Sequence, residues 1–371
     1  MITIKKAGAI GLLSLVIMNG FSQQDSTNAE SAFTYEASYV GDVVNNLSGG
    51  IKTGTNYLGM ANIGLGFDTK KAGLWKGGEV YVNFGNTHGD TPSANLIGDI
   101  QVASNIEAGD MTYLFEAWYK QTLGKLEITL GQQDLNTNFV VTENGGLFLN
   151  SSFGVHTVMS DNITLPIFPT TALGANIRWN PTDAFNWQVA LFDGTPNSRN
   201  PYNTNWIVGK EDGSLWVTEF QLAKSLIKGQ KGTYKLGGYY HKQELSAGMA
   251  YESGGAYIIA DQDINKKLSL FTQIGISPNN INNHNHFYSL GCNVKEFCSK
   301  RPNDVMGLAV AYFGIDEHDI KHETAIEYTY KCQLNENIYL QPDVQYIINP
   351  AGIGVKLDNA LVASIRFGVE F

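Results

Sequence analysis

The chain has 371 residues, of which 16% are charged, 43% are hydrophobic and 11% are aromatic. The formal net charge is −10 and the sequence holds no apolar run of 18 or more residues, so composition argues against nucleic-acid binding and against a helical membrane span. Glycine accounts for 40 of the 371 residues, about 11%, above the roughly 7% of an average protein. Low charge with many glycines and aromatic residues indicates one remaining membrane class, the transmembrane β-barrel.

Residues 1–22 have the features of an export signal. Two lysines lead an apolar stretch from Ala7 to Met18, and small residues stand at the positions that a signal peptidase reads before a cleavage after Ser22. We expect removal of this segment, which leaves residues 23–371 as a single outer-membrane barrel domain. The alternative is a short N-terminal anchor helix, although the stretch is too short for a hydrocarbon core of roughly 30 Å.

Three cysteines occur, Cys292, Cys298 and Cys332, an odd number that cannot pair completely within one chain. Their spacing matches no zinc site. Two interpretations stay open. One is a disulfide between Cys292 and Cys298 that closes a small loop, and the other is three unpaired, small hydrophobic residues on strands and turns.

From residue 30 onward apolar and polar residues alternate with a period of two, the pattern of strands with one apolar face. The clearest case is the C-terminal segment 360–371. The residues on its apolar face are Leu361, Ala363, Ile365, Phe367, Val369 and Phe371. The opposite face carries Ser364, Arg366 and Glu370. The segments are about 9–12 residues long, which suits a tilted strand crossing a bilayer better than the shorter strands of a soluble β-sandwich, the main alternative.

Further features favour an antiparallel up-and-down barrel. Short turns alternate along the chain with long loops rich in Asn, Gly and Pro. Aromatic residues cluster near segment ends, where interfacial girdles lie. They are Tyr39, Tyr57, Trp75, Tyr113, Tyr240, Tyr312, Tyr330 and Phe371. We count roughly seventeen strand candidates, and because bacterial barrels have even strand numbers we predict sixteen, with eighteen left open.

The longest connection, residues 134–171, is too apolar for a free surface loop. Phe139, Phe148 and Phe153 are among its side chains that need burial. A loop of this length in a compact structure is usually functional. We expect it to fold into the barrel as a constriction loop, with an external lid as the alternative.

If the apolar faces of the strands meet lipid, the side chains on the opposite faces line a lumen. They include Glu116, Trp118, Lys120, Lys125, Glu127, Arg178, Glu323, Glu327, Tyr339, Asp343, Gln345 and Arg366. This mixture suits neutral sugars, because sugar hydroxyls both donate and accept and an aromatic ring can cover the C–H face of a pyranose. Strict ion selectivity would need a ring of one charge. A sugar channel and a general, non-selective porin therefore both remain open on these residues.

The sequence contains no GxSxG elbow, P-loop or HExxH motif. His284 and His286 lie in an Asn-rich segment without a third ligand at useful spacing, so we expect a solvated loop and no metal site. Glu323 and Glu327 are of the residue type used by glycosidases, but positions four apart on one strand face are ordinary lumen neighbours. We predict a protein without catalysis, and an outer-membrane barrel enzyme is the alternative.

The order of segments resembles the carbohydrate-selective porins (OprB type) of bacterial outer membranes. The matching stretches include FGNTHGDTPSANLIGDIQVASNIEA (84–108), FEAWYKQTLGKLEITLGQQDLNTNF (115–139), GLFLNSSFG (146–154), ALGANIRWNP (172–181), LQPDVQYIINPAG (340–352) and NALVASIRFGVEF (359–371). The resemblance implies a sixteen-stranded barrel in outer-membrane lipid that admits glucose and related sugars by passive diffusion. It implies a monomer, with a trimer left open, and no cofactor.

In that family inward-folded loops and Arg, Glu and aromatic residues shape the constriction. On the matching segments the resemblance points to Arg178, Glu116, Trp118, Asp134 and Asn136. Together with the lumen residues Glu323, Glu327, Asp343, Gln345 and Arg366, they form the expected substrate-binding and constriction site.

Overall fold

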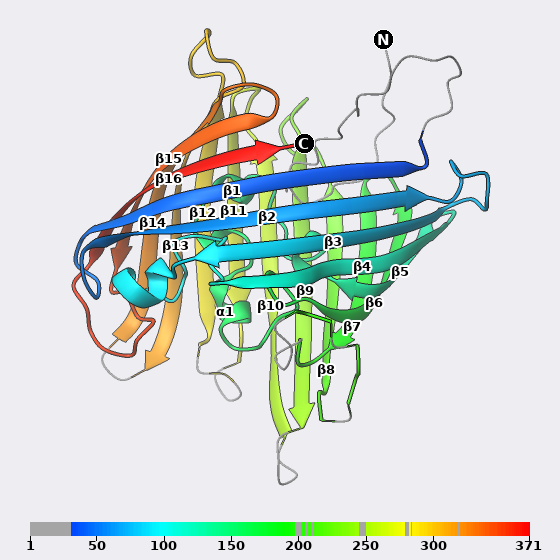
Figure 1. The fold of residues 1–371 in the computed structure, drawn as a ribbon, viewed down its shortest axis with the longest axis horizontal. Helices are drawn as coiled ribbons and strands as arrows, with labels where there is room; N and C mark the ends of the chain where they lie inside the picture. Colours follow the sequence, from blue (N-terminus) through cyan, green and yellow to red (C-terminus); the bar gives the residue numbers. More distant parts are fainter. Residues whose placement is uncertain are drawn as a thin grey trace.

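The computed structural model describes residues 31–196, 202–204, 206–209, 211–244, 250–278, 282, 284–317 and 320–371. In these residues sixteen strands form one closed antiparallel barrel, because β1 (Phe33–Ser48) pairs with β16 (Ala360–Glu370) and every other strand pairs with its neighbours in sequence. Figure 1 shows this arrangement. The predicted fold class and strand number are confirmed. The expected signal peptide, residues 1–22, lies outside the described residues.

The other strands are β2 (Gly54–Asp68), β3 (Gly78–Gly89), β4 (Met111–Leu123), β5 (Leu126–Gln133), β6 (Ala172–Thr182), β7 (Phe185–Asp193), β8 (Ser214–Ala223), β9 (Gly232–Glu244), β10 (Ala250–Asp263), β11 (Leu268–Ile276), β12 (His286–Lys295), β13 (Val305–Glu317), β14 (Ile320–Gln333) and β15 (Ile338–Ile348). The short helical turns of the described residues lie in connections and are η1 (Ser93–Ile97), η2 (Leu135–Thr137), η3 (Gly145–Leu147), η4 (Ser151–Phe153) and α1 (Thr157–Ser160). No helix among the described residues is long and apolar enough to cross a bilayer.

The outer face of the barrel is apolar, as the period of two predicts. Ile63 is 65% exposed, Leu308 52% and Ile365 51%. Their neighbours along each strand face inward, because successive side chains alternate across a strand. On β16, for example, Ser364 and Arg366 are buried on either side of Ile365.

One aromatic residue departs from the expected girdle. Tyr113 faces inward and is buried, with its ring centroid 6.0 Å from Phe115 and 6.4 Å from Phe168. The cause is a β-bulge between β3 and β4, where Asn83 pairs with Glu116 while the next residue, Phe84, pairs with Leu114. The extra residue reverses the parity of the strand.

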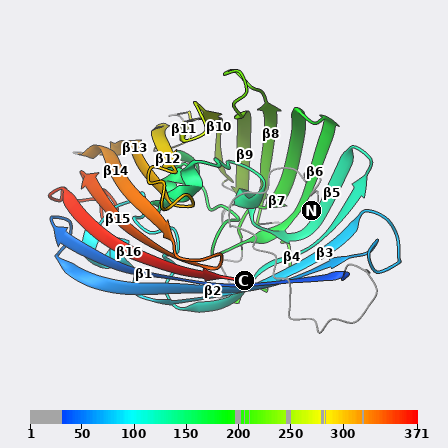
Figure 2. The same ribbon diagram turned by 90° about the horizontal axis from the view of Figure 1, so that it is seen from above.

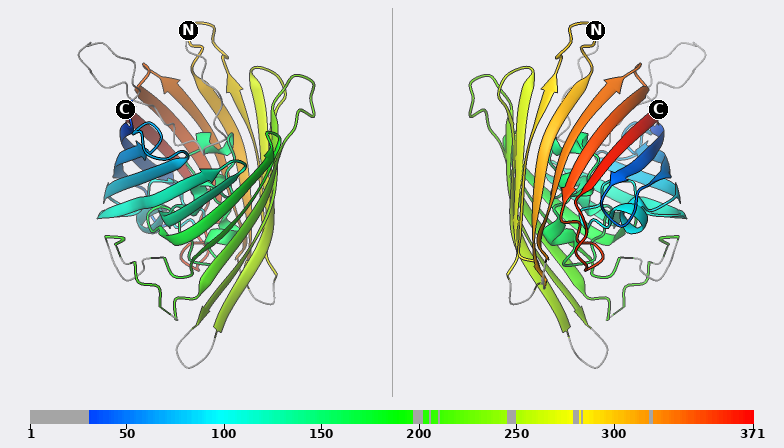
Figure 3. Two further views of the ribbon diagram at one scale, coloured as in Figure 1. Left: turned by 90° about the vertical axis from the view of Figure 1, so that its right-hand side faces the viewer. Right: turned by 90° about the vertical axis from the view of Figure 1, so that its left-hand side faces the viewer.

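The long connections lie at one end of the barrel, called here the loop end, because they all follow odd-numbered strands. They are residues 90–110, 134–171 and 194–213. The opposite end, the turn end, carries the tight turns at 124–125 and 183–184. Two of the long connections, 90–110 and 134–171, contact the inner wall and are called the inward segments; Figures 2 and 3 show α1 within the ring of strands.

The hydrophobic core lies between the inward segments and the inner wall. Phe148 and Phe153 of the second segment pack on Phe271 of β11, with ring centroids 5.6 and 6.0 Å apart. Leu96 and Ile97 of the first segment are buried in a cluster with residues of β1, β2, β15 and β16. An external lid on the barrel would not make these contacts. The sequence analysis did not anticipate the inward course of residues 90–110.

Candidate functional site

Glu323 on β14 holds the first inward segment. Its carboxylate accepts hydrogen bonds from the backbone N–H groups of Ile100 at 3.0 Å and Gln101 at 2.9 Å. A third N–H, of Ala351 in the β15–β16 connection, donates to it at 2.8 Å. Since the side chain is fully buried, these bonds replace the water that the carboxylate would otherwise require.

Glu327, four residues further along the same face of β14, holds the second inward segment in the same way. The N–H groups of Leu149 and Asn150 donate to its two oxygens at 2.6 and 3.0 Å. Neighbouring Gln345 accepts from the Asn150 amide at 3.2 Å and donates to Asp343 at 3.1 Å. Glu327, Asp343 and Gln345 are each no more than 2% exposed, so the inward segments cover them.

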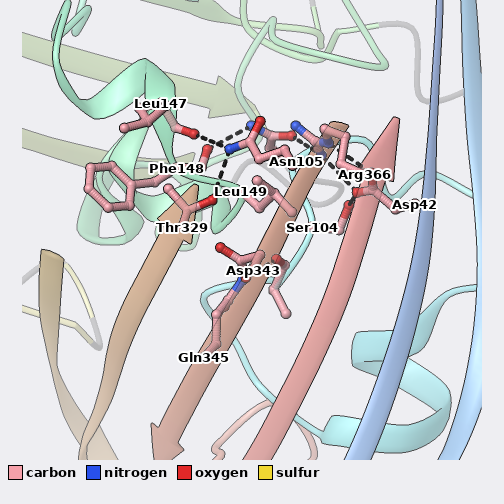
Figure 4. Close-up of polar contacts among 12 residues, drawn as sticks. Asp42, Ser104, Asn105, Leu147, Phe148, Leu149, Thr329, Asp343, Gln345 and Arg366 are labelled. Atoms are coloured by element: carbon pink, nitrogen blue, oxygen red, sulfur yellow. Dashed lines mark hydrogen bonds and ion pairs between the residues drawn. The ribbon is translucent and has the colours of Figure 1, made fainter. Parts of the chain in front are cut away.

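Arg366 on β16 binds inward residues as well as the wall. Its guanidinium group donates to both oxygens of Asp42 on β1, at 2.7 and 2.8 Å, and to Asn105 of the first inward segment at 2.8 Å. Ser104 donates to the same aspartate at 2.7 Å. Figure 4 shows Asp42, Ser104 and Asn105 gathered around the arginine. The Nε and Nη2 donors of Arg366 are thus already bonded to protein acceptors.

Glu116, Asp134 and Asn136 come together where the second inward segment leaves β5. The Asp134 N–H donates to Glu116 at 3.1 Å, and the Asp134 carboxylate accepts from the Asn136 N–H at 2.9 Å, which caps η2. Burial raises the pKa of Asp134 to about 7. These contacts direct the segment inward at its first residues.

Arg178 on β6 faces inward, as its parity predicts, and is half-buried. It donates through Nε and Nη2 to the Gln188 side chain at 3.0 and 2.7 Å, and through Nη2 to Asn138 at 2.9 Å. Asn138 belongs to the second inward segment. Arg178 therefore joins that segment to the wall while part of its surface stays open.

Trp118 on β4 is the half-buried aromatic residue of the same part of the wall. Its ring centroid lies 5.2 Å from that of Tyr81, its register partner on the neighbouring strand β3, and the angle between the two ring planes is 32°. Lys120 lies 5.8 Å from the Trp118 ring and pairs with Glu79 at 2.8 Å. These side chains form an aromatic surface beside a mixed pair of charges.

Five half-buried inner residues of β3 to β6 are called here the lumen strip. It consists of Tyr81, Trp118, Lys120, Glu127 and Arg178. Glu127 and Arg178 are direct partners in register, and so are Tyr81 and Trp118. The inward segments cover the carboxylates of β14 and β15 and leave this strip accessible.

Three further wall carboxylates hold the inward segments and were not singled out in the sequence. Besides Asp42, they are Glu219 on β8, which accepts from the Val140 N–H at 3.0 Å, and Asp261 on β10, which accepts from the Asn144 N–H at 3.0 Å. Glu219 is the single carboxylate of its strand, whereas β1 and β10 each carry more than one. For Glu219 that isolation is the one signal in the sequence that could have found it.

The histidines of the Asn-rich segment behave differently from expectation. His284 is not solvated: it is buried, and its Nε2 lies 2.9 Å from a carboxylate oxygen of Asp161 in the second inward segment. His286 begins β12 and stacks on Tyr312. In the described part of the chain no three His, Cys, Asp or Glu residues form a group that could hold a metal.

The three cysteines are free thiols, so the open alternative of a Cys292–Cys298 disulfide is not realised. Cys332 lies near the turn end, where Arg301 approaches its sulfur to 2.8 Å and forms an ion pair with Asp304 at 2.6 Å. These contacts stay outside the lumen.

A closed sixteen-stranded barrel with an apolar outer face and inward-folded connections is the architecture of an outer-membrane porin. The family model "Carbohydrate-selective porin, OprB family" matches residues 52–371, and the chain belongs to this family. The resemblance found in the sequence is confirmed. It follows that the protein is an outer-membrane carbohydrate channel.

Individual relatives agree with this assignment. The chain is 24% identical to Porin B of Pseudomonas aeruginosa over 92% of this chain and 88% of that protein. The high-pH structure of Pseudomonas putida OprB has a TM-score of 0.82 at 22% identity, over 92% of this chain and 94% of that one. The low-pH structure of the same protein has a TM-score of 0.59 at 19% identity, over 92% and 93%. At these identities the likeness to solved structures shows the shared fold.

Proposed function

We propose that the protein is a passive channel that admits neutral, glucose-like sugars and that the lumen strip is the surface these sugars contact. The observation that carries the proposal is the contrast within the lumen wall. Residues of β14 and β15 are covered by the inward segments, whereas Trp118 and Arg178 stay half-buried. A solute therefore meets the β3–β6 side of the wall.

The chemistry of the strip suits a sugar. The neighbouring Tyr81 and Trp118 rings offer an apolar face for C–H groups, and Arg178 offers donors in a fixed fork. Lys120 and Arg178 are positive and Glu127 is negative, so the strip carries both signs and is not the single-sign ring that would select an ion. Diffusion requires that the solute leave again, so we expect weak binding without energy coupling.

The other members of the expected site take a different role in this proposal. Glu323, Glu327, Asp343, Gln345 and Arg366 hold the inward segments in place, and so set the width of the channel without contacting the sugar. Glu116, Asp134 and Asn136 direct the second segment inward. The single barrel is the proposed functional unit, since one chain supplies the strip and both segments.

Two alternatives are weighed against this function. A general porin would pass sugars and other small solutes at rates set by size alone. A barrel enzyme of the glycosidase type would need accessible carboxyl groups, and the burial of Glu323 and Glu327 beneath the inward segments argues against that pair. This burial favours a channel over an enzyme, and liposome swelling separates the two kinds of channel.

Liposome swelling tests the proposal. Vesicles containing the protein, purified in detergent and checked for heat-modifiable migration, are placed in iso-osmotic glucose, galactose, sucrose, or a non-sugar polyol of similar size. We expect glucose-like monosaccharides to enter fastest. Equal rates for glucose and the size-matched polyol would support the general porin and contradict sugar selectivity.

A further inference from the structure

A second concave surface lies apart from the lumen strip, near the loop end of the barrel. It has a volume of about 390 Å³ and lies between the second inward segment, from Ser160 to Thr170, and the wall residues His241, Gln243 and Tyr251 on β9 and β10. Ligand pockets for small molecules begin at about 300 Å³, so this hollow has room for one small solute.

His241, one of the lining residues, is buried with one ring nitrogen unpaired. The residue is 2% exposed, and its Nε2 lies 2.8 Å from the backbone carbonyl of Gly194. A carbonyl oxygen only accepts, so Nε2 carries the proton and Nδ1 presents a lone pair. Nδ1 has no hydrogen-bond partner among the described residues. A buried acceptor without a partner is costly unless something else donates to it.

Other polar groups around the hollow are also available. The hydroxyls of Ser160 and Thr164 and the amide of Gln243 make no hydrogen bond to any residue that the structure describes. The Tyr251 ring stands at 61° to the His241 ring, 6.0 Å away, and its hydroxyl donates to the Asn162 carbonyl. The lining thus combines an aromatic ring with unpaired donors and acceptors.

The charges around the hollow restrict what it can bind. Among the described residues that line it, none is Lys or Arg, which disfavours anions such as sugar phosphates. The carboxylate present, Asp161, is paired with His284 at 2.9 Å, which disfavours a free cation. A neutral molecule with several hydroxyls and an apolar face fits both conditions.

We propose that this hollow is an outer docking site for a neutral saccharide, which captures sugar at the loop end before it reaches the lumen strip. The inference rests on the proposed function, since it presumes that sugar passes through the barrel. Tyr251 covers one face of the sugar ring, while Gln243 and Thr164 bond to its hydroxyls. The site raises the rate of sugar entry from the loop end only.

Glucose block of ion current through single channels in planar bilayers tests this proposal, with glucose added separately to each side. Gln243→Leu and Thr164→Val remove hydrogen-bonding groups with little change in volume. Because one hydrogen bond contributes about 0.5–1.5 kcal/mol, we expect the association rate from the loop end to fall about threefold to tenfold in each single variant and at least about fivefold in the double variant. The rate from the turn end should not change.

Two further variants complete the test. Gln221→Leu is the matched control, because Gln221 is a half-buried inner residue of β8 near the turn end and should leave both rates unchanged. Thr164→Trp fills the hollow from an exposed position and should lower the loop-end rate without disturbing the fold. Wild-type channels without any glucose block would contradict the proposed function itself. Wild-type block with unchanged rates in the variants, or an equal fall from both sides, would overturn the docking site alone.

Discussion

Arg366 and Asp42 face each other across the seam at which the barrel closes, and the guanidinium group donates to both carboxylate oxygens at 2.7 and 2.8 Å. They are direct partners in register between β16 and β1, and both are buried. Arg366 also donates to Asn105 of the first inward segment. The pair therefore holds together β1, β16 and the first inward segment.

Replacing the arginine should weaken the barrel. Arg366→Ala leaves the Asp42 carboxylate buried without its partner, which costs about 3–5 kcal/mol in a buried pair. The measurement is the urea midpoint of unfolding in detergent, followed by heat-modifiable migration. Lys120→Ala is the control, since its exposed pair with Glu79 should contribute no more than about 1 kcal/mol. Equal midpoints in the two variants would contradict the role assigned to the seam pair.

Loosening the second inward segment should widen the channel. Glu327→Gln replaces a carboxylate that accepts two backbone N–H bonds with an amide that can accept one and places its own donors against the other. The loss of a charged hydrogen bond weakens the anchoring by about 1.5–3 kcal/mol. Single-channel recordings should show higher conductance and more open-channel noise. Glu336→Gln, in the exposed turn between β14 and β15, is the control, and wild-type conductance in Glu327→Gln would refute the anchoring role.

The inward segments should lose stability as pH rises. Burial raises the pKa of Asp134 to about 7 and, in the first segment, that of Glu107 to about 7, and it also raises the pKa of Asp99. The folded state therefore favours the protonated form, so this contribution is complete below about pH 4, the unfolded pKa, and is lost as pH rises through the folded values.

The urea midpoint of the wild type should accordingly fall between pH 5 and pH 8. Asp134→Asn keeps an acceptor for the Asn136 N–H and removes the titration, so its midpoint should depend less on pH. A midpoint that rises with pH over this range, or an identical slope in the variant, would show that Asp134 does not titrate as stated.

Arg178 should affect both the width and the selectivity of the channel. Arg178→Ala removes the bonds to Gln188 and to Asn138 of the inward segment, and with them the fork that we propose as a sugar contact. We expect conductance to rise and glucose block to weaken while the barrel remains heat-modifiable. Arg301→Ala, which removes the same charge at the turn end, should leave both unchanged. Identical recordings from the two variants would remove Arg178 from the site.

Much of the fold could be predicted because parity is a local property of a strand. The alternation around Ile365 and Arg366 is visible in the sequence alone, and it correctly separates the outer face from the lumen. Tyr113 marks the limit of that rule, since the bulge at Phe115 reverses the parity and nothing in the local pattern announces it. The inward course of the second segment followed from its phenylalanines.

Which inner residues are covered by the inward segments and which stay accessible could not be predicted in the same way. Glu323 and Arg178 have the same inward parity, yet one is covered by the first inward segment and the other is not. That difference depends on the contact between Glu323 and Ile100, which lie 223 residues apart. The donor is a backbone N–H that every residue except proline possesses, so the sequence carries no mark of it.

The position of the sugar path is tested most directly by glucose block of single channels in two variants that each lose an inner aromatic ring near a lysine. Trp118 belongs to the lumen strip, with Lys120 5.8 Å from its ring, and Tyr339 lies buried on β15, with Lys331 3.8 Å from its ring. We predict that Trp118→Leu loses most of the glucose block and that Tyr339→Leu retains it. Block that survives in Trp118→Leu and disappears in Tyr339→Leu would contradict the account.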